Sequence, residues 1–366
     1  MKITRYISRI LIGLVFIFSG TVKAIDPLGS AYKFHDYFQA FNLGFLDKLS
    51  LPLAVILCTA EFIAGFAVLT GLRQRNGLWL VMLMMSIFTP LTFVLALTNP
   101  VSDCGCFGDA VHLTNWQTFG KNIILLAAAI LLLSGIKQIK QGFKTSTEWA
   151  AIASAGILFI LFNVYNLRYL PVIDFLPYKT GVKIAEKMII PEDAPADIYE
   201  TTFIYEKEGT RKEFTINNYP SSDTAWKFID QKSVLVKKGY EPPIHGFSIV
   251  INNKDITEDV LSNEGLTMLM ISRKLGDADP EKLKEGFEFR KRLGSEGIDF
   301  YVLTSSGAEE IQTYSPAIKI CQTDETALKT MIRSNPGYIL ISNGTILGKW
   351  SWANRPDITD ILKFKK

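Results

Sequence analysis

The 366-residue sequence has few of the residues from which closed zinc sites are built, with only four cysteines and three histidines. A closed zinc site takes four Cys or His ligands, and His112 is the one histidine near the cysteine pair Cys104 and Cys106. The formal net charge is only +3, and the basic patch typical of nucleic-acid-binding proteins is missing. We therefore expect no nucleic-acid partner and no metal.

Charge is almost missing from the long apolar runs before residue 168, whereas charged residues are concentrated after residue 178. Hydrophobic residues make up 48% of the chain, a high share for a wholly soluble protein. Five apolar runs are candidates for membrane spans, at residues 10–22, 51–72, 77–98, 118–136 and 149–167. The first run could also be the core of a signal peptide, but no clear cleavage site follows it. The sequence predicts an α-helical membrane bundle followed by a soluble part.

The basic residues outside the spans predict the orientation of the bundle. They are Lys2, Arg5 and Arg9 before the first span, Arg73 and Arg75 after the second, and Lys137, Lys140 and Lys144 after the fourth. The loop 99–117 has neither Lys nor Arg. Because basic loops stay in the cytoplasm, we expect a cytoplasmic N-terminus. The loop 99–117 and the C-terminal half then share the opposite, oxidising side.

Small and aromatic residues shape the first part of the bundle. Gly13, Ser19 and Gly20 would let the first span approach a neighbouring helix closely, and Lys23 would extend its ammonium to the membrane interface. Residues 24–50 have a turn signal at Pro27 and several aromatic side chains among polar ones, which predicts an interfacial helix or a re-entrant segment.

The loop Asp103-Cys104-Gly105-Cys106-Phe107-Gly108 is the best candidate for chemistry. Its glycines would let the backbone fold tightly enough to bring the two sulfurs together. A disulfide closed over one residue would be strained, and strained disulfides are easily reduced. The pair can therefore be a redox-active dithiol, a structural disulfide, a metal half-site or two ordinary cysteines. The loop has no cation to lower a thiol pKa, which argues mildly against a fast nucleophile.

Glu61 is the one charged residue in the second expected span. An acidic side chain inside a span is costly, so it marks a functional or a packing site. The carboxyl can serve proton-coupled chemistry, or it can pair with Lys23 or Lys121. Cys58 lies one helical turn before it, and a buried cysteine usually behaves as a small apolar residue.

From residue 247 on, strand-like and helix-like segments alternate. The expected strands are 247–251, 266–272, 298–304, 337–342 and 346–350, and the expected helices are 281–293, 326–333 and 358–364. Asn343-Gly344 is a typical hairpin turn. This alternation predicts an α/β domain. Residues 180–246 contain short strand-like runs at 201–205 and 213–216 and a helical stretch at 225–230, and they indicate no particular fold.

Residues 1–140 resemble the DoxX/MauE family of small bacterial membrane proteins. The resemblance lies in Phe16-Ile17-Phe18-Ser19-Gly20, Lys23-Ala24-Ile25-Asp26-Pro27, Glu61-Phe62-Ile63-Ala64-Gly65 and Asp103-Cys104-Gly105-Cys106-Phe107-Gly108. It implies a four-helix membrane module in thiosulfate- or quinone-linked electron transfer, or in the oxidative maturation of a periplasmic partner. In the MauE case the module works with a separate thioredoxin-like protein.

Residues 247–366 resemble the thioredoxin fold, in which a cis-proline precedes the hairpin strand beside the active site; Pro336 matches that place. The family's Cys-x-x-Cys should open the helix after strand 266–272, but this chain has Arg273-Lys274-Leu275-Gly276-Asp277. We therefore expect no dithiol exchange by this domain alone. Its single cysteine, Cys321, is expected to be a buried core thiol.

The sequence thus predicts a four-helix membrane module at 1–140, a fifth span and linker at 141–179, an extracytoplasmic segment of unassigned fold at 180–246, and a thioredoxin-like domain at 247–366. The favoured hypothesis is a bacterial inner-membrane protein with a periplasmic C-terminal domain, in which Cys104, Cys106 and Glu61 carry thiol or quinone-linked electron transfer with a protein partner. The alternative is a non-enzymatic membrane anchor or assembly subunit whose outer domain docks a periplasmic partner. Membrane lipid is a contact in both.

Overall fold

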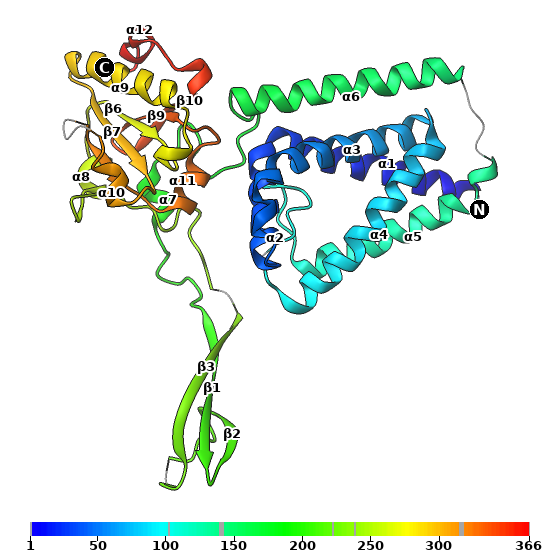
Figure 1. Cartoon of the computed structure of the whole chain (residues 1–366), viewed down its shortest axis with the longest axis horizontal. Coiled ribbons are helices and arrows are strands. Elements are labelled where there is room, and N and C mark those ends of the chain that lie inside the picture. Colours follow the sequence, from blue (N-terminus) through cyan, green and yellow to red (C-terminus); the bar gives the residue numbers. More distant parts are fainter. Residues whose placement is uncertain are drawn as a thin grey trace.

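The computed structural model describes residues 2–101, 103–138, 143–221, 223–237, 239–314 and 318–365. Lys140, one of the basic residues used to predict the orientation, lies outside them. Figure 1 shows a helical bundle, an α/β domain beside one end of it, and a narrow sheet that projects away from both. The α/β domain is called the outer domain below.

Among the described residues, the bundle has five apolar helices long enough to cross a membrane, which confirms the expected membrane fold. They are α1 (Lys2–Ile25), α3 (Ser50–Thr70), α4 (Gln74–Thr98), α5 (Asn115–Leu133) and α6 (Thr145–Arg168). Local signals set their ends: Thr114 and Gln117 form a capping box at the start of α5. Gly71 ends α3 in the left-handed conformation, with φ of +87°.

Helices α1 and α3 approach so closely that only glycine fits at their crossing. A Cβ atom on Gly20 would lie 2.6 Å from the carbonyl oxygen of Cys58, and one on Gly65 would lie 2.7 Å from the nitrogen of Ile17. The expectation that Gly20 permits a close helix contact is therefore confirmed. This crossing positions Lys23 on α1 against Glu61 on α3.

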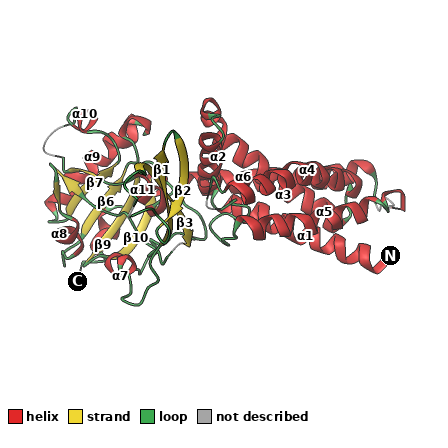
Figure 2. Cartoon of the chain, turned by 90° about the horizontal axis from the view of Figure 1, so that it is seen from below, coloured by secondary structure: helices red, strands yellow, loops and turns green. Residues whose placement is uncertain are grey.

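Helix α2 (Pro27–Ala40) runs across the end of the bundle and lies between it and the outer domain (Figures 1 and 2). Pro27 does not make a turn as expected but begins the helix, where its missing N–H costs no hydrogen bond. Asp26 caps the helix by accepting a hydrogen bond from the Gly29 nitrogen at 2.8 Å. Residues 27–40 thus form a helix at the bundle end, which is one of the two alternatives that the aromatic pattern left open.

The outer domain is built on a seven-stranded mixed sheet with the order β10-β9-β6-β7-β8-β4-β5. Its strands are β4 (Val250–Ile251), β5 (Lys254–Asp255), β6 (Thr267–Ile271), β7 (Asp299–Thr304), β8 (Ile320–Gln322), β9 (Gly337–Ser342) and β10 (Thr345–Ser351). Strands β6, β7 and β8 are parallel, and β9 is antiparallel to β6. The expected α/β domain is thereby confirmed, and the Asn335-Pro336 peptide before β9 is cis as the resemblance implied.

Helices cover both faces of this sheet because its strands alternate apolar side chains between the two faces. One core packs Leu269 and Ile271 with α11 (Glu325–Met331), and the other packs Met268 and Met270 with α9 (Pro280–Ser295) and α12 (Ile358–Leu362). The outer domain also contains the short helices α7 (Ile184–Met188), α8 (Thr257–Leu261) and α10 (Ala308–Ile311). Ile184 lies in the first core, so part of the segment 180–246 belongs to this domain.

The projecting sheet has the order β2-β1-β3 and is antiparallel, with β1 (Ile198–Lys207), β2 (Thr210–Thr215) and β3 (Lys227–Lys237). The expected helix at 225–230 is therefore wrong. Phe228 pairs with Tyr205 across the sheet, and their rings are 5.8 Å apart. Pairing of aromatic and β-branched residues with β1 outweighs the weak local helical pattern.

Candidate functional site at the thiol loop

The thiol loop, residues 103–108, lies between α4 and α5. The Sγ atoms of Cys104 and Cys106 are 2.9 Å apart, and both cysteines are half-buried free thiols. Gly105 and Gly108 have φ of +64° and +54°, which other residues rarely adopt. Asp103 accepts a hydrogen bond from the Gly105 nitrogen at 2.7 Å. The expected meeting of the two sulfurs is confirmed, and it depends on these glycines.

Side chains from α1 and α2 hold the loop in this conformation. The Tyr37 hydroxyl donates to the carbonyl oxygen of Cys104 at 2.6 Å, and the Ser19 hydroxyl donates to that of Cys106 at 2.8 Å. Lys33 pairs with Asp103 at 3.0 Å. These anchors were not identified from the sequence, because an ordinary Ser, Lys or Tyr carries no signal of what it contacts.

Glu61 forms an ion pair with Lys23 inside the bundle. The Lys23 ammonium lies 2.7 and 2.8 Å from the two carboxylate oxygens, and it donates to Ser19 at 2.8 Å. Lys23 is only 6% exposed, so the expectation that it extends to the interface is wrong. A charge facing it across the α1–α3 crossing makes burial tolerable. The chain Glu61, Lys23, Ser19 connects the ion pair to the backbone of the thiol loop.

The three residues predicted to form the site, Cys104, Cys106 and Glu61, line one pocket of about 100 Å³. Its other walls come from α1, α2, α3 and α4, and are mainly apolar side chains such as Phe34 and Phe88. Cys58 does not line this pocket. Its buried thiol donates a hydrogen bond to Asn163 Oδ1 at 3.1 Å. The tertiary structure therefore brings the two thiols next to a buried ion pair. Each thiol is at least 43 positions in sequence from either member of that pair.

The two thiols differ in acidity. The hydrogen bond shared with Cys104 and the ammonium groups of Lys121 and Lys23 lower the pKa of Cys106 to about 6, although burial opposes this. The same hydrogen bond, together with burial, raises the pKa of Cys104. Sequence reasoning found no cation in the loop itself; the two lysines reach it from neighbouring helices. The expected obstacle to a reactive thiolate is thereby removed at Cys106.

Arg333 joins the outer domain to the thiol loop. Its Nε lies 2.7 Å from Asp26 Oδ2, and its Nη2 lies 2.7 Å from Asp109 Oδ2. It also donates to the carbonyl oxygen of Lys329. The Arg333 side chain is 5% exposed, so the contact is buried. Nothing in the sequence indicated it, because Arg333 is 307 and 224 positions from its two acidic partners.

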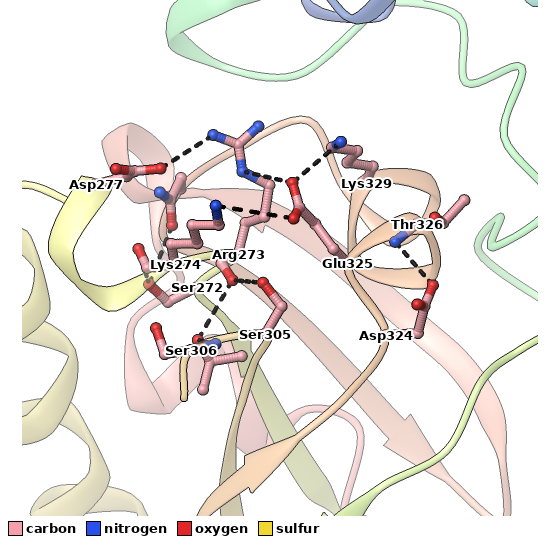
Figure 3. A network of polar contacts seen from close by, with 12 residues as sticks. Ser272, Arg273, Lys274, Asp277, Ser305, Ser306, Asp324, Glu325, Thr326 and Lys329 are labelled. Atoms are coloured by element: carbon pink, nitrogen blue, oxygen red, sulfur yellow. Dashed lines mark hydrogen bonds and ion pairs between the residues drawn. The ribbon is translucent and has the colours of Figure 1, made fainter. Parts of the chain in front are cut away.

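A charged network covers the outer-domain face that meets α2 (Figure 3). Arg273 and Lys274 follow β6, and Arg273 interacts with Asp277 at 3.4 Å and with Glu325 at 4.0 Å. Arg273 and Lys329 also lie over the ring of Tyr32 on α2, at 5.5 and 5.2 Å from its centroid. The place where the resemblance implies a Cys-x-x-Cys is thus part of an ion-pair network against the membrane module.

The outer domain has its own thiol, Cys321, which is fully buried in β8 as expected. Burial raises its pKa to about 12. Such a thiol stays protonated and shielded from partners, which agrees with a core role. Within the described residues, no group of three or more His, Cys, Asp or Glu side chains is arranged to hold a metal ion.

Different parts of the chain are similar to different known protein families. Residues 199–238, the projecting sheet, match a domain of unknown function (DUF8463). Protein TlpB of Flavobacterium psychrophilum is 28% identical over 130 residues, which cover 35% of this chain and 35% of that protein. No solved structure matches. Residues 1–135, from α1 to the end of α5 and including the thiol loop, match the family of methylamine utilisation protein MauE, so the membrane module is MauE-like.

Proposed function

We propose that this chain is a bacterial inner-membrane protein that transfers electrons through reversible thiol–disulfide chemistry at Cys104 and Cys106. The single observation that carries the proposal is the 2.9 Å approach of the two sulfurs at a pocket shared with the Lys23–Glu61 pair. A structural clip alone needs no thiolate-stabilising cations and no buried ion pair beside it. The match to the MauE family over residues 1–135 supports a membrane setting for this chemistry.

The reaction balances as a two-electron exchange. Oxidation of the pair forms one S–S bond between Cys104 and Cys106 and releases two electrons and two protons. A membrane quinone can accept the two electrons and two protons and become a quinol. The apolar side chains of Phe34, Leu57 and Phe88 line the pocket beside the thiols. Reduction by the dithiol of an extracytoplasmic protein restores the thiols and leaves that protein with a disulfide.

Each residue of the site has a distinct task in this proposal. Cys106, whose pKa is lowered to about 6, supplies the attacking or leaving thiolate. Cys104 keeps its proton until it resolves the mixed disulfide. Glu61 and Lys23 hold Ser19, which positions the Cys106 backbone.

The proposed compartment rests on the basic residues together with one structural contact. Arg333 of the outer domain binds Asp109 next to the thiol loop, so the domain and the thiols lie at the same end of the bundle. The basic connections predict that this end faces the periplasm. The strand order supports a thioredoxin-like outer domain, which has Arg273 and Lys274 where the resemblance implies the dithiol.

The test uses reduced full-length protein in lipid nanodiscs with a short-chain ubiquinone. The loss of quinone absorbance should correspond to one quinone reduced to quinol for each protein chain. Mass spectrometry should show that the peptide with Cys104 and Cys106 has lost two hydrogens. Cys104→Ser should abolish both signals. The matched control, Cys58→Ser with Cys321→Ser, should leave both intact. No quinol, and no reduction of the oxidised pair by a dithiol peptide, would refute the proposal.

The second candidate function is a membrane anchor whose outer domain docks a periplasmic partner. It is favoured by one observation, the ion-pair network of Arg273 and Glu325 at the place where a redox domain would carry its dithiol. In that case Cys104→Ser would lower the thermal midpoint of the protein, and neither the quinone nor the dithiol peptide would react.

A further inference from the structure

We propose that the outer domain is a reversible cover over the thiol loop, held closed by Arg333. The guanidinium bridges Asp26 at the start of α2 and Asp109 immediately after the loop, each at 2.7 Å. Through Asp109 the bridge reaches the segment that carries the thiols. Through Asp26 it reaches the cap of the helix that anchors Cys104 by way of Tyr37.

The surfaces around Arg333 form a second, independent part of the closed contact. Tyr32 on α2 faces Arg273, Lys329 and Arg333, with cation-to-ring distances of 5.2 to 5.5 Å. A cation over the face of an aromatic ring is attracted electrostatically, so this contact does not require a buried apolar interface. These contacts between the outer domain and the bundle join charged and aromatic groups.

Such an interface is suited to opening. A buried ion pair repays only part of the solvation that its charges lose, so the bridge favours the closed state by a modest margin that opening can overcome. When the surfaces separate, Arg333, Asp26 and Asp109 all regain water together. Removal of one partner from the closed state is different, because it leaves a buried charge unpaired. Interfaces between domains of one chain are commonly mobile unless they are large and apolar.

Closure limits which partners reach the sulfurs. Cys104 and Cys106 are half-buried with the domain in place, so a small molecule can reach them. A folded protein that presents a dithiol needs more room and therefore requires the cover to open. The inference rests on the proposed function for its purpose, but it is tested by access to the thiols and not by electron transfer.

The test compares two maleimides of different size on a chain that retains only Cys104 and Cys106, with serine at positions 58 and 321. N-ethylmaleimide should react readily with the reduced, native protein. A 5-kDa polyethylene-glycol maleimide should react at least tenfold more slowly. Arg333→Ala should raise the ratio of the large to the small reagent's rate by about tenfold, since the cover then lacks its bridge. The matched control is Lys291→Ala, which removes an exposed ion pair with Glu288 on α9 and should leave the ratio unchanged.

Asp109→Asn provides a second variant if Arg333→Ala does not fold, because it weakens one arm of the bridge and keeps the other. It should raise the same ratio, by a smaller factor than Arg333→Ala. An unchanged ratio in folded, monodisperse variants would overturn the cover, and so would equal rates for both reagents on the parent chain. Failure of the quinone assay with a positive accessibility result would reject the proposed function alone.

Discussion

Replacement of Glu61 by Gln tests the ion pair on which the site is built. The carboxylate is 4% exposed and accepts two hydrogen bonds from Lys23, at 2.7 and 2.8 Å. The glutamine side chain would fill nearly the same space but carry no charge. The Lys23 ammonium would then remain in the bundle without a counter-ion, and we expect this to destabilise the protein.

The size of the loss follows from the burial of both partners. Removal of one member of a buried pair typically costs roughly 3–5 kcal/mol, because the other charge is left uncompensated. With about 1.4 kcal/mol for each factor of ten, the folded-to-unfolded ratio should fall by roughly a hundredfold to several thousandfold. Replacement of both residues by neutral ones should cost much less. We therefore expect Lys23→Met with Glu61→Gln to be more stable than Glu61→Gln alone.

The assay measures thermal midpoint and activity in the same nanodisc preparation. Glu61→Gln should lower the midpoint and the steady-state amount of protein. The double variant should recover the midpoint but not the electron transfer, because Ser19 has lost the lysine that holds it against the Cys106 backbone. This separation distinguishes a packing role of the pair from its contribution to the thiol site.

Two results would refute the reasoning. If Glu61→Gln kept the wild-type midpoint, the pair would not be the stabilising element that its burial implies. If the double variant were as unstable as the single one, an unpaired Lys23 would not be the cause. A normal midpoint with lost activity would instead assign Glu61 to proton-coupled chemistry.

Three further predictions concern thiols and orientation. Because the pKa of Cys106 is lowered to about 6, its thiolate forms as the pH rises through that value. Its alkylation by iodoacetamide should therefore level off near neutral pH, and a rate still rising steeply above about pH 8 would contradict this. Cys321→Ser should keep electron transfer and cost about 1–3 kcal/mol of stability at most, whereas Cys104→Ser should abolish transfer; equal loss at normal protein level would make the outer domain a redox partner. Reporter fusions at Asn76 and Val250 should locate in the cytoplasm and the periplasm, respectively; a cytoplasmic Val250 would place the outer domain and the thiols away from the oxidising side.

The sequence predicted the helices and strands that depend on residues close together in the chain. The five spans follow from apolar runs, because charged groups are costly in hydrocarbon. Strands such as 337–342 and the turn at Asn343-Gly344 follow from short-range patterns, and the structure has them. The local helical pattern at 225–230 was outweighed by pairing of β3 with β1, which no local window contains.

The amino-acid sequence by itself determined that a membrane bundle carries two thiols beside glycines and that an α/β domain follows. Only the tertiary structure decided which charges meet those thiols. Lys23 and Lys121 approach Cys106 from α1 and α5, and Arg333 reaches Asp109 from another domain. The acidity of a thiol and the strength of an ion pair depend on distance and burial. For residues up to 307 positions apart, both are properties of helix and domain packing and not of any local pattern.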